Sequence, residues 1–137
     1  MSTLQKNITV SGKRKTAIAK ATIKSGKGII LINKKPYEAL DFFKKLTIQE
    51  PLEIAKKVLG EINFDINVGI LGGGSQSQIE AARLSIAKAI VKFTNSEKLK
   101  REYLEYDKSL LVADTRRKEA CKPGDSKARA KRQKSFR

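Results

Sequence analysis

The sequence predicts an α+β domain, in which helices pack on one side of a mixed sheet of about four strands, followed by an extended basic tail. Three observations predict this fold. Alternating apolar and polar residues fill most of residues 7–36, which is the pattern of half-buried strands. Apolar residues at helical spacing dominate residues 47–110, interrupted by one more alternating segment at 64–70. Basic residues crowd the end of the chain. We expect residues 1–112 to form the domain and residues 113–137 the tail.

The first three strands are expected before residue 37. Residues 7–10 form a short extended piece, and residues 16–24 alternate between an apolar and a polar face. The apolar face of the second strand consists of Ala17, Ala19, Ala21 and Ile23. Residues 25–28 (Ser-Gly-Lys-Gly) predict a hairpin turn into the apolar run 29–32, and residues 33–36 close that strand.

The first helix and the fourth strand follow. Thr47 to Glu50 form a capping-box pattern, and Gly60 is a natural end for the helix. Apolar residues then recur at helical spacing at Ile48, Leu52, Ala55 and Leu59. Pro51 would lie in the first turn, where proline costs little. Residues 64–70 alternate apolar and polar side chains most regularly and predict the fourth strand.

Two more helices are expected after the glycine-rich residues 72–78. The longer helix carries an apolar stripe formed by Ile79, Ala82, Ile86, Ile90 and Phe93. The last helix begins at about Glu97, and its apolar face contains Leu99, Tyr103, Tyr106 and Leu110. Because both tyrosines share this face, we expect core or edge aromatics rather than platforms for base stacking. The order of elements is β-β-β-α-β-α-α.

The net charge of +16 results from 30 Lys and Arg against 14 Asp and Glu. A compact chain with this charge repels itself, which indicates a polyanionic partner such as a nucleic acid. A membrane surface is the alternative. However, no apolar run has the length of a transmembrane helix, and residues 1–10 lack the features of a signal peptide. We therefore expect a soluble, cytoplasmic protein with no membrane partner.

Two absences in the composition disfavour an enzyme. The chain has no His, which removes imidazole chemistry and His-liganded metals. Its single cysteine, Cys121, lies in a polar, basic stretch and can form neither an internal disulfide nor a cysteine-cluster metal site. We expect no metal, no cofactor and no catalytic residue.

Half of the excess charge lies in residues 116–137, where ten basic residues oppose two acidic ones. The last eleven residues contain six cations and no acid. Such a segment buries too little apolar surface to fold alone, so we expect it to be disordered without RNA. A solvated, nonspecific tail is the alternative. Small residues between the cations let an extended backbone approach phosphates, and the terminal Phe136 and Arg137 suit stacking and phosphate binding.

Two sites in the domain are candidates for contacts with RNA. Residues 11–16 (Ser-Gly-Lys-Arg-Lys-Thr) are predicted to form a basic turn whose three cations face phosphates, although a solvated turn is also possible. Residues 72–74 are three glycines between a strand and a helix. They fit a turn with positive φ, or a close approach of an RNA backbone beside Gln78 and Arg83. They lack the lysine of a P-loop and the spacing of a dinucleotide fingerprint.

Four blocks of this sequence, in order, resemble the universal family of the ninth protein of the small ribosomal subunit. They are residues 12–21 (Gly-Lys-Arg-Lys-Thr-Ala-Ile-Ala-Lys-Ala), Gly26 to Asn33, Gly72 to Gln78, and the tail from Asp114 to Arg137. The match spans nearly the whole chain. The ending Ser-Phe-Arg, and Ser77 where many bacterial relatives carry glycine, indicate the archaeal or eukaryotic branch.

The resemblance implies the fold of the second domain of ribosomal protein five, with a left-handed β-α-β crossover that runs against the usual rule. It also implies contact with neighbouring ribosomal proteins and with ribosomal RNA in the head of the subunit. Together with the charge pattern, it indicates rRNA binding by Lys13, Arg14, Lys15, Gly72, Gly73, Gly74, Gln78, Arg83, Arg116, Arg117, Lys118, Lys122, Lys127, Arg129, Lys131 and Arg132. The tail would reach the P site and contact the tRNA anticodon stem-loop through Lys134, Ser135, Phe136 and Arg137.

Two other function classes are alternatives to this hypothesis. A small phosphotransferase could use the glycine turn, but the missing P-loop lysine counts against it. A general nucleic-acid packaging protein would share the high positive charge. Unlike a ribosomal component, such a protein would bind DNA and RNA duplexes alike.

Overall fold

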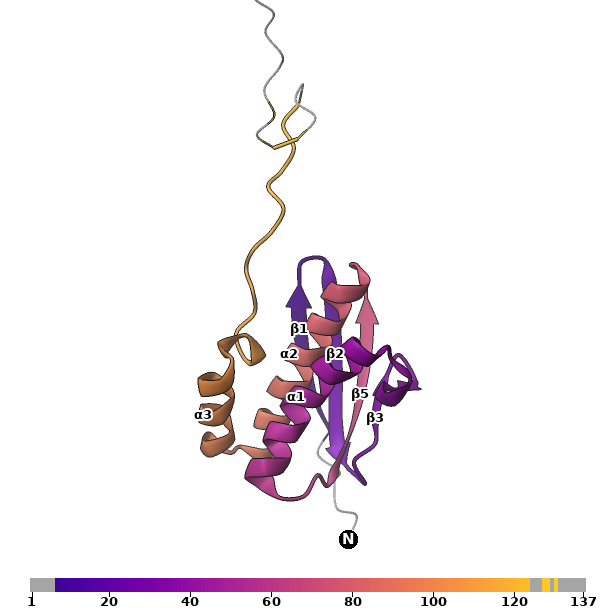
Figure 1. Cartoon of the computed structure of the whole chain (residues 1–137), viewed down its shortest axis with the longest axis vertical. Helices are drawn as coiled ribbons and strands as arrows, with labels where there is room; N and C mark the ends of the chain where they lie inside the picture. The colour runs from indigo at the N-terminus through magenta and orange to yellow at the C-terminus, as the bar shows by residue number, and fades with distance from the viewer. Residues whose placement is uncertain (1–6, 124–126, 129, 131–137) are drawn as a thin grey trace, which may run out of the picture.

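The protein folds around a five-stranded sheet with the strand order β1-β2-β5-β3-β4 (Figure 1). The computed structural model describes residues 7–123, 127, 128 and 130. Its strands are β1 (Ile8–Arg14), β2 (Ala17–Ser25), β3 (Ile30–Ile32), β4 (Lys35–Pro36) and β5 (Phe64–Leu71). β3 and β5 run parallel, and the other neighbouring pairs are antiparallel. The sheet is therefore mixed, as predicted, and β4 is a short additional strand.

Three α-helices lie on one side of this sheet, so the α+β prediction is confirmed (Figure 1). They are α1 (Phe42–Leu59), α2 (Ser75–Thr94) and α3 (Glu97–Tyr106), with the 3-10 helices η1 (Tyr37–Ala39) and η2 (Lys108–Leu110). α2 packs on β1 and β2, α1 packs beside α2, and α3 packs against α1. In the described part of the chain, no helix covers the opposite face of the sheet.

The crossover from β3 through α1 to β5 is left-handed. Figure 1 views the sheet with the helices in front, and there β5 lies to the left of β3. Both strands point the same way, so the chain moves leftward as it crosses in front of the sheet. Most such crossovers are right-handed, because the twist of the strands favours that hand. This is the handedness that the family resemblance implied.

The hairpin predicted at residues 25–28 is wrong. β2 and β3 are not neighbours, because β5 inserts between them and pairs with both. Asp65 at the start of β5 explains this path, since its Oδ1 accepts hydrogen bonds from the backbone N–H groups of Lys27, Gly28 and Ile29 at 2.9, 3.1 and 2.9 Å. These bonds tie the loop to β5 and direct β3 into parallel pairing with it.

Replacing Asp65 with alanine is expected to lower the free energy of unfolding by about 1 kcal/mol at neutral pH, because three N–H groups lose their acceptor. The hydrogen bond from Ile29 is the main cause that lowers the pKa of Asp65 below its ordinary value of 3.8. Its contribution is therefore present above that value and lost as the pH falls through the lowered pKa. Urea unfolding at pH 7 and at pH 2 measures both effects. Asp65→Asn, which keeps one acceptor, is the control and should lose less; equal loss in both variants would contradict the proposed role of the acceptor.

The first helix begins earlier than predicted. α1 starts at Phe42, so Thr47 lies inside the helix, where its Oγ1 donates to the carbonyl of Phe43 at 3.0 Å instead of capping. Pro51 is consequently in the helix interior rather than in the first turn, and it is buried. The carbonyl of Pro51 accepts a hydrogen bond from the hydroxyl of Tyr103 at 2.7 Å, which links α1 to α3.

The last helix is shorter than predicted. α3 ends at Tyr106, and Leu110 reaches the core from η2. Tyr103 is fully buried as expected, and burial raises the pKa of its hydroxyl. Tyr106 does not belong to the core, because it is 59% exposed.

The core between the sheet and α2 is built from unusually small residues. The inward side chains of β2 include Ala17, Ala19 and Ala21, all fully buried. Gly12 faces α2 from β1, and a Cβ placed there would lie 2.5 Å from the carbonyl oxygen of Ala81. The small residues therefore allow the helix backbone to lie almost directly on the strands.

Candidate nucleic-acid interface

Three segments that are distant in sequence meet at one end of the domain (Figure 1). They are the Lys15–Thr16 turn between β1 and β2, the three glycines between β5 and α2, and the start of the tail at residues 116–118. A Cβ on Gly72 would lie 2.9 Å from the carbonyl oxygen of Thr16, which shows how closely the first two segments approach. The first and third border a shared hollow lined by Arg14, Lys15, Thr16, Arg116, Arg117 and Lys118. We call the three segments together the basic end.

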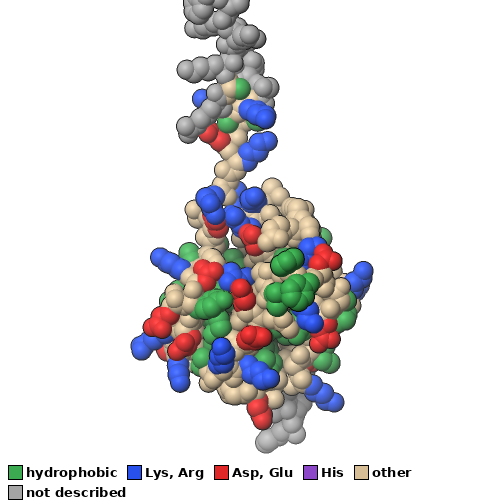
Figure 2. Space-filling model, in the orientation of Figure 1, with side chains coloured by type: hydrophobic (Ala, Val, Ile, Leu, Met, Phe, Trp, Pro, Cys, Tyr) green, Lys and Arg blue, Asp and Glu red, His purple; other side chains and the backbone are tan. Residues whose placement is uncertain are grey.

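The side chains of the basic end are predominantly cationic. Lys15, Arg116, Arg117 and Lys118 are all exposed. Figure 2 shows Lys and Arg side chains gathered where the tail leaves the domain. Converging cations of this kind raise the local potential and attract phosphate groups.

The glycine turn has a structural explanation. Gly72 and Gly73 both have φ of +72°, a backbone conformation that residues with a Cβ rarely adopt. A Cβ on Gly73 would also lie 2.7 Å from the Cβ of Ala17. Gln78 closes the turn, because its Nε2 donates to the carbonyl of Gly72 at 3.1 Å. The positive-φ alternative is therefore confirmed, and the approach of an RNA backbone remains a prediction.

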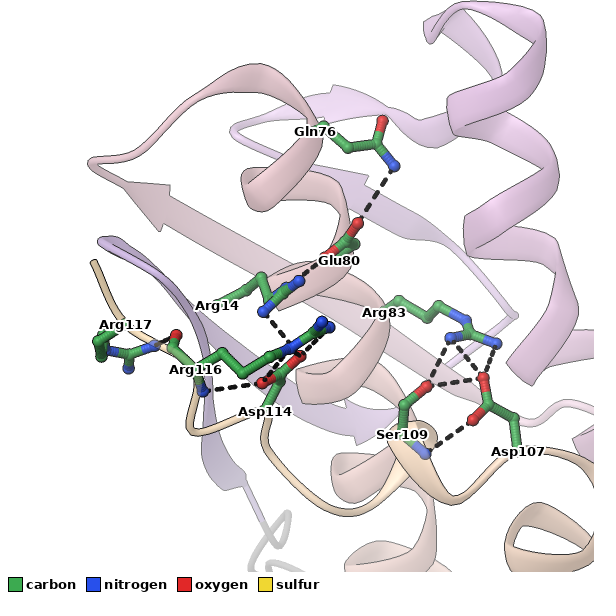
Figure 3. A network of polar contacts seen from close by, with 9 residues as sticks. All are labelled: Arg14, Gln76, Glu80, Arg83, Asp107, Ser109, Asp114, Arg116 and Arg117. Atoms are coloured by element: carbon green, nitrogen blue, oxygen red, sulfur yellow. Dashed lines mark hydrogen bonds and ion pairs between the residues drawn. The ribbon is translucent and has the colours of Figure 1, made fainter. Parts of the chain in front are cut away.

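Arg14 is paired with carboxylates of the protein and is not exposed to a partner as the neighbouring lysines are (Figure 3). Its Nε donates to Glu80 Oε2 at 2.6 Å, and its Nη1 lies 2.8 Å from Asp114 Oδ2 in an ion pair without hydrogen-bond geometry. Only 17% of the side chain is exposed. Since neighbouring residues of a strand point to opposite faces, Lys13 faces away from Arg14. The predicted patch of three adjacent cations is thus divided between two faces.

Asp114 fixes the start of the tail. Its Oδ1 accepts a hydrogen bond from the backbone N–H of Arg116 at 2.8 Å, and the guanidinium of Arg116 donates to Oδ2. The hydrogen bond from the Arg116 side chain is the main cause that holds the pKa of Asp114 well below its usual range, and the same contact raises the pKa of Arg116. Arg14, Glu80 and Asp114 therefore connect β1, α2 and the tail at the point where the tail departs.

The chain was compared with known protein families and with curated proteins. The model of a family described as "Ribosomal protein S9/S16" matches residues 12–137. The chain belongs to this family. Small ribosomal subunit protein uS9 of Methanococcus maripaludis strain C5 is 50% identical over 129 residues, which cover 92% of this chain and 95% of that protein. The protein of the same name from Methanococcus vannielii is 48% identical over the same shares of the two chains. The predicted resemblance to the archaeal or eukaryotic branch is thereby confirmed, since these relatives are archaeal.

Membership of the S9/S16 family makes this chain a ribosomal protein, a structural component and not an enzyme. Within the described residues, no three His, Cys, Asp or Glu side chains are grouped to hold a metal ion, and no helix could span a membrane. Cys121 is exposed and forms no disulfide.

Arg83 also differs from its predicted setting (Figure 3). Its guanidinium lies 2.7 Å from Glu50 Oε2 and donates to Asp107 Oδ2 at 3.1 Å and to Ser109 Oγ at 3.1 Å. The side chain is 16% exposed. Burial alone would raise the pKa of Asp107, but hydrogen bonds from Ser109 and Arg83 outweigh it and lower this pKa. Arg83 thus joins α1, α2 and η2.

The remaining predicted residues fall into two groups. Lys13, Lys122 and Lys127 are exposed, so their side chains are accessible to a partner. Seven predicted contact residues lie outside the described part of the chain: Arg129, Lys131, Arg132, Lys134, Ser135, Phe136 and Arg137. The sequence did not reveal the acidic partners of Arg14 and Arg83, which are both partly buried. One local signal existed, since Asp114–Arg116 and Asp107–Ser109 both have the i, i+2 spacing of an Asx turn.

Proposed function

We propose that this chain is a structural constituent of the small subunit of the cytoplasmic ribosome, where it binds rRNA in the head and extends its tail to the P-site tRNA. The observation that carries the proposal is the basic end, where exposed cations from two segments meet at the point from which the tail departs. The names of the curated relatives support a location in the small subunit.

The domain would dock on folded rRNA through its exposed cations. Lys15, Arg117 and Lys118 contact phosphates at the basic end, and the glycine turn beside them lets the RNA backbone come close. Lys13 adds a contact on the face of the sheet opposite the helices. Arg14 and Arg83 support these contacts by fixing the segments that carry them, because both are committed to carboxylates of the protein. Phosphate contacts of this kind set orientation and do not require base reading.

The tail would act as a second contacting unit. Residues 113–123 have no helix or strand and lead away from the domain at the basic end (Figure 1). Eleven extended residues span about 36 Å, so the residues beyond 126 can reach well past the domain. Their cations would neutralise rRNA phosphates, and the last four residues would contact the anticodon stem-loop of the tRNA.

Co-sedimentation with small subunits in high salt tests the proposal as a whole. A ribosomal constituent remains with the subunit, because many contacts hold it in a specific place. A general packaging protein is released and binds DNA and RNA duplexes alike. Release of the chain from small subunits, with equal affinity for both duplexes, would contradict the proposal.

Deleting residues 135–137 is expected to weaken tRNA retention in the P site of purified small subunits about fivefold at 0.15 M salt, because one phosphate contact is lost. The six cations of residues 127–137 also predict that log affinity of the tail for RNA falls with log salt at a slope of about −4. Filter binding of labelled tRNA measures the first effect. Lys56→Gln with Lys57→Gln is a control on α1, away from the tail. Unchanged retention in the truncated subunits would assign the tail to assembly instead of tRNA contact.

A further inference from the structure

The face of the sheet opposite α1 and α2 has a surface of its own. Along β1, β2 and β5, buried residues alternate with residues that point outward. The outward positions on the three strands are Thr9, Ser11, Lys13, Ile18, Lys20, Thr22, Lys24, Asp65, Asn67, Gly69 and Leu71. We call this surface the open face. It continues into the basic end, because the Lys15–Thr16 turn and Gly72 directly follow its strands.

Gly69 is in the middle of the open face without an internal reason for being glycine. The pairing of β5 with β2 is unbroken on both sides of it, so there is no bulge. A Cβ at position 69 would meet nothing within 4 Å. Glycine weakens a strand interior, and a glycine that serves no turn or bulge is typical of a place where another backbone or a ligand approaches. Within the described part of the chain, nothing makes that approach.

The charge of the open face suits a polyanion. Lys20 is the direct cross-strand neighbour of Gly69 on one side and of Ser11 on the other. On the same face, Lys13 lies in the row before this one, and Lys24 lies two rows after it, opposite Asp65. The carboxylate on this face, Asp65, already accepts three backbone N–H groups. Lys20 and Lys13 therefore lie next to the bare backbone at Gly69, and Lys24 adds a third exposed cation further along β2.

The side chains between the lysines favour RNA over a protein partner. The next row contains Thr9, Thr22 and Asn67, where the two threonine hydroxyls lie 3.2 Å apart. Short hydroxyl and amide groups bond phosphate and sugar oxygens, whereas the centre of a protein interface is apolar and rich in aromatic residues. The large exposed apolar side chains of the described strands here, Ile18 and Leu71, lie together in the row beside Lys13 and not beside Gly69.

We propose that the open face is a second rRNA-docking surface, on which an RNA backbone crosses β5 at Gly69 and is held by Lys20 and Lys24. This inference rests on the proposed function and extends it, because these three residues are distinct from the basic end and from the tail. The contact reads the shape and charge of RNA without reading its bases.

Gly69→Val separates a role in RNA binding from a structural role, because it is expected to stabilise the free protein and to weaken its binding to rRNA. In the free protein the β-branched side chain suits a strand, so the melting temperature should rise by about 3 °C. On small-subunit rRNA the same side chain holds the backbone away, so the dissociation constant should rise about fivefold at 0.15 M salt, the loss of one phosphate contact. Filter binding of the full chain to small-subunit rRNA measures the second effect.

A charge variant tests the same surface independently. Lys20→Gln with Lys24→Gln should make the salt slope of rRNA binding less steep by about 1.5 and raise the dissociation constant about 20-fold. Lys56→Gln with Lys57→Gln removes the same charge from exposed positions of α1 and should change the slope less.

The outcomes distinguish this inference from the proposed function. If the unchanged chain does not bind rRNA, the proposed function fails and the inference fails with it. If the unchanged chain binds and both open-face variants bind equally well, the inference alone is overturned. If Gly69→Val is incorporated poorly into small subunits but binds naked rRNA normally, the open face contacts a protein, and the inference is likewise overturned.

Discussion

Gly12→Ala is expected to lower the free energy of unfolding by about 3 kcal/mol. The added Cβ would lie 2.5 Å from the carbonyl oxygen of Ala81 and 2.8 Å from the backbone nitrogen of Ser85. Both atoms belong to the backbone of α2, so no side-chain rotation relieves the clash, and the helix has to move off the sheet. Urea unfolding followed by circular dichroism measures the loss.

Gly69→Ala is the matched control for this substitution. It makes the same chemical change in the same sheet, but its Cβ meets nothing within 4 Å. Because alanine has a smaller backbone entropy cost than glycine, the control should be neutral or stabilising by up to about 1 kcal/mol. Similar destabilisation by both substitutions would show that loss of glycine itself, and not contact with α2, is what the protein does not tolerate.

The strands and helices that sequence patterns predicted well are those whose pattern is local. The alternation in residues 16–24 and 64–70 correctly indicated which side chains of β2 and β5 are buried. The hairpin at residues 25–28 was wrong because strand pairing is not local. A Gly-rich turn does not determine which strand the next strand pairs with. Here β3 pairs with β5 because the loop before β3 is bound by the carboxylate of Asp65, which lies 36 residues beyond Ile29. Nothing in the turn sequence itself carries that information.

The same distinction applies to the candidate site. The charge pattern indicated the cations near the start of the tail as candidates, but it could not separate exposed cations from paired ones. Arg14 pairs with Glu80 across 66 positions of sequence, and Arg83 pairs with Asp107 across 24. The division of Lys13 from Arg14 was predictable in principle, because it follows from strand alternation once β1 is known to continue to Arg14.

Replacing Lys15, Arg117 and Lys118 together with glutamine is expected to weaken binding of the chain to small-subunit rRNA about 100-fold at 0.15 M salt. Each of these exposed cations can neutralise one phosphate. When such a contact is lost, fewer counterions are released from the RNA as the chain binds. The salt slope should become less steep by about 2 to 3. Filter binding over a range of salt concentrations measures both quantities. Arg116 is left in place because it also binds Asp114 and so holds the start of the tail.

The control for this variant replaces Lys56, Lys57 and Lys92 with glutamine. These lysines are exposed on α1 and α2, so the control removes the same charge without touching the basic end. If the total charge of the protein governs binding, the two triple variants lose equal affinity. If binding depends on where three segments of the chain meet, the basic-end variant loses far more, and its free energy of unfolding stays unchanged because its side chains are exposed. Equal losses would refute the basic end as a docking site and leave only nonspecific attraction between a cationic protein and RNA.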